Sequence, residues 1–228
     1  MKNVLTLIML SIATLASGQG KQQRTVADFS AVSAATGIEV ELTQGNENAV
    51  SVTVSDEKYS EGLITEVEKG VLRIYYKTAT KMYRDKNRKL QAFVTYRSLN
   101  KISGSSGAGI VSKNAVMATA FSLDMSSGSN FSGEIKATDL KIDQSSGAIS
   151  NVSGSAANVK ADVSSGGIFR GNDLNAENCK ASVSTGGMLR ITVNKKLTAK
   201  ASTGGMVYYK GDPEVQKSLR TGGEVSKK

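Results

Sequence analysis

The C-terminal half of the chain repeats one pattern of apolar and polar positions about every 20 residues. Each repeat centres on a glycine that follows serine or threonine, and apolar residues stand three, five and seven positions before it. Apolar residues at alternate positions are typical of a β-strand with one buried face. The pattern therefore predicts one strand before each repeat glycine. These glycines are Gly107, Gly128, Gly147, Gly166, Gly186, Gly204 and Gly222.

A second short apolar element follows each glycine, as in Ile168-Phe169 and Met188-Leu189. Two strands and a corner fill so short a period and leave no room for a crossover helix. Units of this size must stack on their neighbours to bury a core. The sequence thus predicts an all-β, single-stranded β-helix or β-solenoid of about seven Ser/Thr-Gly coils over residues 101–228. We expect glycine to supply a positive φ at each corner, and the hydroxyls to stack between coils or bond the local backbone.

Residues 19–100 also contain segments in which apolar and polar residues alternate, but they lack the glycine repeat. We expect this region to cap or start the solenoid, because the end of a stack leaves an open edge. The residues between the first two alternating segments, Thr43-Gln44-Gly45-Asn46, predict a hairpin, and a short helix is expected over residues 56–63. The alternating segments are residues 38–42, 50–54, 71–75 and 92–96.

Residues 1–18 have the features of a secretory signal peptide. A basic start at Lys2 precedes an apolar run and a small-residue end. Gln19 and Gly20 stand where a lipoprotein would carry its cysteine, so we expect export without a lipid anchor, to the periplasm, the outer cell surface or the medium. An uncleaved anchor is the alternative. No later segment is long and apolar enough to span a bilayer, so no transmembrane segment is expected in the mature chain.

Several segments resemble those of a known family. They are Phe29-Ser30-Ala31-Val32, residues 37–45, Gly70-Val71-Leu72-Arg73-Ile74 and the Ser-Gly repeats from Ile102 onward. With these segments the chain resembles the putative auto-transporter adhesin, head GIN domain proteins of the bacterial envelope. The resemblance implies an adhesin-like role and assigns no binding residues.

Composition restricts the chemistry. The absence of histidine excludes Ser-His-Asp and Cys-His catalysis and the usual zinc sites. Cys179, the single cysteine, has no partner for a disulfide within the chain. It takes a ladder position that other repeats fill with Phe, Leu or Val, so we expect a buried, inert thiol. We therefore expect no catalytic residues, no metal site and no cofactor.

Two charge ladders accompany the repeats. The acids Asp124, Asp143 and Asp162 stand four positions before their glycines, on neighbouring coils roughly 5 Å apart. A retaining glycosidase needs two carboxyl groups at such a separation, so a polysaccharide-acting glycosidase or lyase is the alternative function. However, lysines stand two positions earlier on the same face and would keep these acids ionised. The lysines are Lys141, Lys160 and Lys180.

The chain is basic, with a formal net charge of +9, and its densest basic run covers residues 77–89. Such a loop suits an anionic glycan, lipopolysaccharide or an envelope protein, or is simply solvated. Export makes nucleic acid a poor partner. Tyr208-Tyr209-Lys210 is the second candidate, where alternation predicts one packed and one exposed tyrosine. The candidate binding residues are Lys81, Tyr83, Arg84, Lys86, Arg88, Lys89, Tyr208, Tyr209 and Lys210.

Together these features predict a non-enzymatic, exported β-solenoid of the envelope or cell surface, with an adhesin-like binding role or a structural one.

Overall fold

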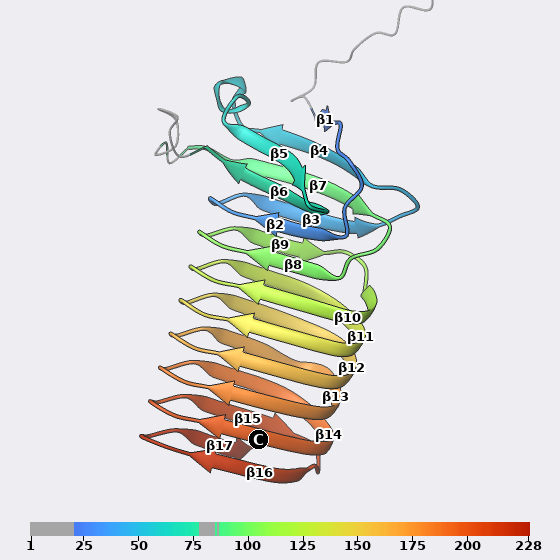
Figure 1. The fold of residues 1–228 in the computed structure, drawn as a ribbon. Coiled ribbons are helices and arrows are strands. Elements are labelled where there is room, and N and C mark those ends of the chain that lie inside the picture. Colours follow the sequence, from blue (N-terminus) through green and yellow to red (C-terminus); the bar gives the residue numbers. More distant parts are fainter. Residues whose placement is uncertain (1–20, 78–84, 86) are drawn as a thin grey trace, which may run out of the picture.

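Strands stack along a single axis in the structure, a computed structural model that describes residues 21–77, 85 and 87–228 (Figure 1). Nearly all of the stacked neighbours pair in parallel, each coil on the next. Equivalent repeat positions are in register, as in Leu140 opposite Val159 and Val159 opposite Cys179. The predicted all-β solenoid is confirmed.

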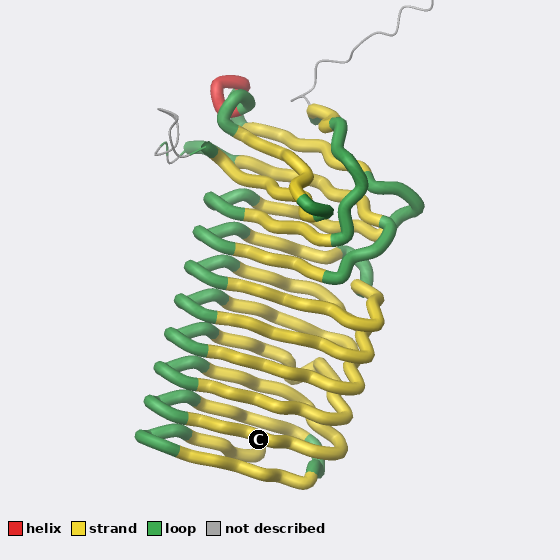
Figure 2. The backbone as a smooth tube through the Cα atoms, viewed as in Figure 1, coloured by secondary structure: helices red, strands yellow, loops and turns green. Residues whose placement is uncertain are grey.

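Each coil contributes to two facing sheets. We call the segments that precede the Ser/Thr-Gly corners sheet A and those that follow them sheet B. The corners form one edge of the stack and continuous strands bend around the other (Figure 2). The regular coils comprise β8 (Lys101–Gly104), β9 (Gly109–Ser112), β10 (Val116–Met125), β11 (Asn130–Gln144), β12 (Ile149–Val163), β13 (Ile168–Val183), β14 (Met188–Ala201), β15 (Met206–Lys210), β16 (Glu214–Leu219) and β17 (Glu224–Lys227).

Each corner is a tight turn with two left-handed residues. At one corner φ is 52° for Ser146 and 71° for Gly147, and the Ala148 N–H donates to the Ser145 carbonyl at 3.0 Å. Two positive φ values in succession are those of a type I′ turn. The Gly147 N–H also donates to the Ser165 carbonyl of the next coil at 3.1 Å. Glycine turns the corner as predicted, and backbone hydrogen bonds join one corner to the next. At one corner a hydroxyl also joins two coils, because Ser129 Oγ donates to the Gly104 carbonyl at 2.9 Å.

A further corner lies at Thr36-Gly37, between β2 (Ala31–Ala34) and β3 (Glu39–Gln44). The Gly37 N–H donates to the Ser106 carbonyl at 3.0 Å, in the pattern of the other corners. β2 and β3 therefore form a coil that stacks on β8 and β9. Gly37 stands 70 residues before Gly107, so the period of about 20 residues did not include this corner.

The two sheets extend beyond β2 and β3 at the N-terminal end. In sheet A, β6 (Val71–Tyr76) pairs with β2, and β5 (Leu63–Glu68) runs antiparallel to β6. In sheet B, β7 (Leu90–Tyr96) pairs with β3, followed by the antiparallel strands β4 (Ala49–Val54) and β1 (Gln22–Arg24).

The hairpin predicted from residues 43–46 is wrong. β7 lies between β3 and β4 and pairs with both over their full length, so these two strands do not pair with each other. The predicted short helix is a single 3₁₀ turn, η1 (Glu57–Tyr59). Within the described residues, no helix has the length and apolar character needed to cross a membrane.

The core fills the space between the two sheets. The inward row of sheet B alternates in size where Ser150 lies between Phe131 and Phe169, all three of them buried. The facing sheet carries small residues in its middle row, namely Ala161, Ala181 and Ala199. The same row carries Leu123 and Ile142 in the preceding coils, so both inward rows mix large and small side chains to fill the core.

Candidate binding pocket on the C-terminal coils

The basic run is only partly described. Lys81, Tyr83, Arg84 and Lys86 lie outside the described residues. The Arg88 guanidinium lies 4.2 Å from the centre of the Tyr76 ring and donates to the Thr36 carbonyl at 3.3 Å. Arg88 thus helps to hold the N-terminal coil together. Lys89 is exposed beside it, and both residues line a hollow of about 820 Å³ next to Glu39.

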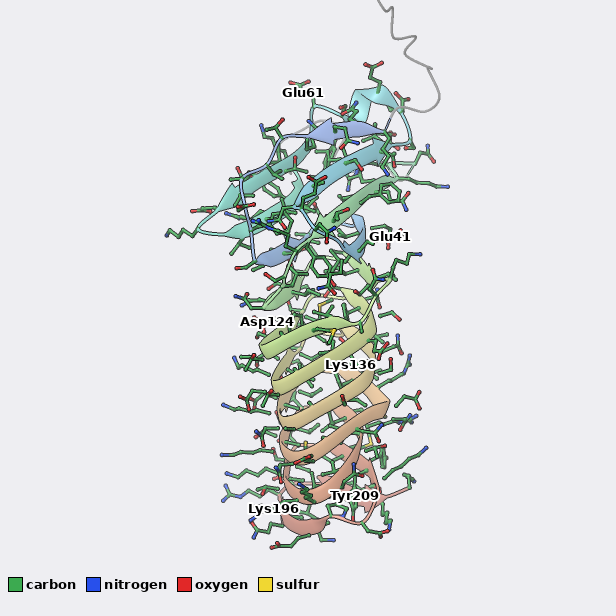
Figure 3. All side chains as sticks on the ribbon, turned by 90° about the vertical axis from the view of Figure 1, so that its right-hand side faces the viewer. Glu41, Glu61, Asp124, Lys136, Lys196 and Tyr209 are labelled. Carbon is green, nitrogen blue, oxygen red and sulfur yellow. The ribbon has the colours of Figure 1, made fainter. Side chains whose placement is uncertain are left out.

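The second candidate group lies at the other end of the solenoid, on β15. Tyr209 packs against the core, whereas Tyr208 points away from it. The Tyr208 hydroxyl lies 3.3 Å from Met206 Sδ and 3.4 Å from Glu224 Oε2. Tyr209 is packed as the alternation predicts, whereas Tyr208 is half-buried rather than exposed. Figure 3 shows Tyr209 near the C-terminal end of the stack, on the opposite side from Asp124.

Tyr208, Tyr209 and Lys210 share one pocket of about 370 Å³, which we call the Tyr208 pocket. The structure thus brings together three of the nine predicted binding residues and places Arg88 and Lys89 at the far end of the stack. Neighbouring coils supply the remaining lining residues. The full lining is Asn172, Met188, Arg190, Tyr208, Tyr209, Lys210 and Lys228.

Cations surround the outward-pointing tyrosine of this pocket. The Arg190 guanidinium lies 5.8 Å from the centre of the Tyr208 ring, and Lys228 Nζ lies 4.9 Å from it. Lys210 adds a third positive charge, and the one carboxylate that the Tyr208 hydroxyl contacts among the described residues, that of Glu224, stands outside the lining. An aromatic wall that holds cations in place presents positive charge and an apolar surface together. Such a pocket suits a small anionic group attached to a partly apolar body.

Sequence reasoning missed Arg190, Met188, Asn172 and Lys228 as parts of this pocket. Arg190 lies directly opposite Tyr208, and Met188 lies opposite Met206, in the pairing of β14 with β15. The sequence contains a signal for these two pairs. When the repeats are aligned on their glycines, Arg190 and Tyr208 stand at the same distance after the glycine, and so do Met188 and Met206. Residues from the bend, such as Asn172, carry no comparable signal because the bend varies in length between coils.

The outward face of sheet A carries the predicted charge ladders. Asp124 lies opposite Asp143, which lies opposite Asp162. Lys141 Nζ pairs with Asp143 at 2.6 Å, and Asp143 raises the pKa of that lysine by accepting its hydrogen bond. Lys101 of the preceding coil pairs with Asp124. Because lysines accompany the first two acids on an exposed surface, nothing in this geometry favours a catalytic carboxyl pair.

Cys179 is buried in the core, and burial raises the pKa of its thiol to about 12. Since thiolate is the reactive form, we expect Cys179 to resist a thiol reagent at neutral pH while the protein is folded. Labelling with dithionitrobenzoate should be slow in buffer and complete within minutes in concentrated urea. Rapid labelling in buffer would show that this part of sheet A opens.

The stacked parallel coils define a β-solenoid that buries most of its described aromatic side chains between its sheets and carries its charge ladders on an outer face. The chain belongs to the family described as putative auto-transporter adhesin, head GIN domain, whose model matches residues 28–213. No curated protein matches the chain.

Solved structures share this fold. A putative adhesin from Bacteroides fragilis is 18% identical with a TM-score of 0.79, covering 93% of this chain and 97% of that one. A putative adhesin from Parabacteroides distasonis is 20% identical with a TM-score of 0.72, covering 92% and 96%. A putative lipid binding protein from the same species is 17% identical with a TM-score of 0.67, covering 93% and 98%. At these identities the likeness shows the fold alone.

Proposed function

We propose that this protein is a non-enzymatic, exported binding module of the bacterial cell surface with an adhesin-like role. The Tyr208 pocket carries the proposal, because Arg190, Lys210 and Lys228 surround an aromatic wall there. Membership of an adhesin-like family supports it. The partner is the anionic part of a surface glycan or lipopolysaccharide.

Export rests on residues 1–18, which lie outside the described residues but have the basic start and apolar run of a signal peptide. We further infer that residues 19–100 cap the stack and that residues 101–228 present the binding surfaces. The antiparallel strands at the N-terminal end support this division, because they cover the edge that a parallel coil would leave open.

The pocket is tested with the phosphorylated core oligosaccharide released from lipopolysaccharide, measured by isothermal titration calorimetry. We expect Tyr208→Ala to weaken binding about tenfold, because it removes the aromatic wall and the support for both cations. Lys228→Gln should weaken binding less and reduce its salt dependence.

The matched control is Lys69→Gln, which removes one positive charge from an exposed turn at the N-terminal end. It should leave the affinity unchanged, and the dephosphorylated oligosaccharide should bind weakly to every variant. Equal affinity of Tyr208→Ala and the unaltered protein would refute a role for this pocket.

A further inference from the structure

A third hollow, of about 660 Å³, runs across sheet A, over strands β10 to β14. We call it the axial groove, because it crosses the strands and therefore follows the axis of the stack. One residue from each of four successive coils lies beneath it, with a side chain that turns inward to the core and is at most 3% exposed. These are Phe121, Leu140, Val159 and Cys179.

One wall of the axial groove is a ladder of hydrogen-bonded side chains. Asn158 Nδ2 donates to Asp139 Oδ1 at 2.9 Å, and Asn178 Nδ2 donates to Asn158 Oδ1 at 3.1 Å. Lys196 continues this row in the next coil. The ladder holds its amides in line, so it presents polar groups at the coil spacing of roughly 4.8 Å.

The opposite wall contains Lys141, Lys160 and Lys180, which lie opposite one another in successive coils. These lysines are not equivalent. Lys141 is paired with Asp143, whereas Lys160 and Lys180 form no ion pair within the described part of the chain. Positive charge therefore remains available along the groove.

The neighbouring acid row explains why the charge grows toward the C-terminal end. After Asp162 the row continues with Ser182 and then Lys200. The lysines of β13 and β14 thus have no acid ladder beside them, unlike those of the earlier coils. Figure 3 shows Lys196 near the C-terminal end of the stack, on the same side as Asp124.

We propose that the axial groove binds an extended acidic polysaccharide that lies along the solenoid axis. A glycan of uronic acids repeats its carboxylate at a spacing similar to that of the coils, so successive sugars meet successive lysines. The amide ladder offers hydrogen bonds to hydroxyl groups, and the lysine stems contact the C–H faces of the sugar rings. The groove and the Tyr208 pocket lie on opposite sheets, so they are separate sites.

Length dependence tests the proposal. The probes are oligogalacturonates from dimer to octamer, with neutral oligomers of the same lengths as controls. The affinity of the unaltered protein for the acidic oligomers should rise with length until the groove is filled, and the neutral oligomers should bind weakly. Octamer binding no tighter than dimer binding would overturn an axial mode.

The lysine variants locate the site. Lys160→Gln and Lys180→Gln should each weaken octamer binding about fivefold, as expected for a charge contact at a protein surface. Lys69→Gln removes the same charge far from the groove and should have no effect. Tyr208→Ala should also bind the octamer normally, so a failure of the Tyr208 pocket and a failure of the groove are distinguishable.

Ser182→Asp provides a test that leaves the groove lining intact. It extends the acid row by one coil at a position where three earlier coils already carry aspartate, and it places a carboxylate beside Lys180. We expect weaker octamer binding, whereas Ser182→Asn should bind as the unaltered protein does. Unchanged octamer affinity in Lys160→Gln, Lys180→Gln and Ser182→Asp would overturn the proposal. Binding to phosphatidylglycerol vesicles without binding to any oligomer would also overturn it, in favour of a membrane surface.

Discussion

Gly205→Ala is expected to destabilise the fold by about 3 kcal/mol, as overpacking against a fixed backbone does. A Cβ atom on Gly205 would lie 2.3 Å from the Val183 carbonyl oxygen, in the preceding coil. Both coils are held there by the hydrogen bonds between corners, so neither can move away cheaply. The free energy of unfolding, measured by urea denaturation, should fall accordingly.

The same position in other coils provides a graded series. A Cβ atom would approach backbone oxygen to 2.8 Å at Gly187 and to 3.1 Å at Gly167. The cost should therefore decrease to about 2 kcal/mol for Gly187→Ala and about 1 kcal/mol or less for Gly167→Ala. Ala148 occupies this position two coils before Gly187, and Ala148→Gly should be mildly destabilising instead. Equal losses across the glycine series would show that close approach of the coils is not the cause.

Phe169→Ala should cost about 4 kcal/mol, because it leaves a large cavity between the sheets. Phe169 is fully buried, and its ring lies so close to Gly171 that a Cβ atom there would be 2.6 Å from ring atom Cε1. The neighbour Ser150 is too small to fill the space that the ring would vacate. Urea denaturation again measures the loss.

Phe169→Leu is the matched control for this cavity. Leu189 already fills the equivalent position of the next coil, so leucine is compatible with the inward row of sheet B. The expected cost is about 1 kcal/mol. A loss as large as that of Phe169→Ala would mean that ring shape, rather than volume, is what the core requires.

The sequence predicted the regular coils well because their signal is local and repeated. Alternation before each glycine sets the inward face of a strand, and equal spacing sets the register, so Asp143 was placed opposite Asp162 before the structure was considered. The N-terminal coils were harder. β7 separates β3 from β4 through pairings made over long sequence distances, and no local turn pattern encodes them.

The candidate sites were predictable only in part. Tyr208 and Tyr209 were identified from strand alternation, but the pocket also depends on Lys228, which reaches it from beyond β17. The ladder of lysines on sheet A was recognised from the sequence, and its positive charge was interpreted as neutralised by the neighbouring row of aspartates. That interpretation holds for Lys141 but not for Lys180, because the acid row ends at Asp162.

The central claim, that this is an exported binding module displayed at the cell surface, is tested most directly by labelling a single introduced cysteine on living cells. Glu61→Cys places an exposed thiol on the N-terminal cap, far from the Tyr208 pocket (Figure 3). Cys179 is buried, so the unaltered protein is the unlabelled control. The account predicts that a membrane-impermeant maleimide labels Glu61→Cys on intact cells as fully as on permeabilised cells. Labelling only after permeabilisation would place the protein inside the outer membrane and contradict an adhesin-like role.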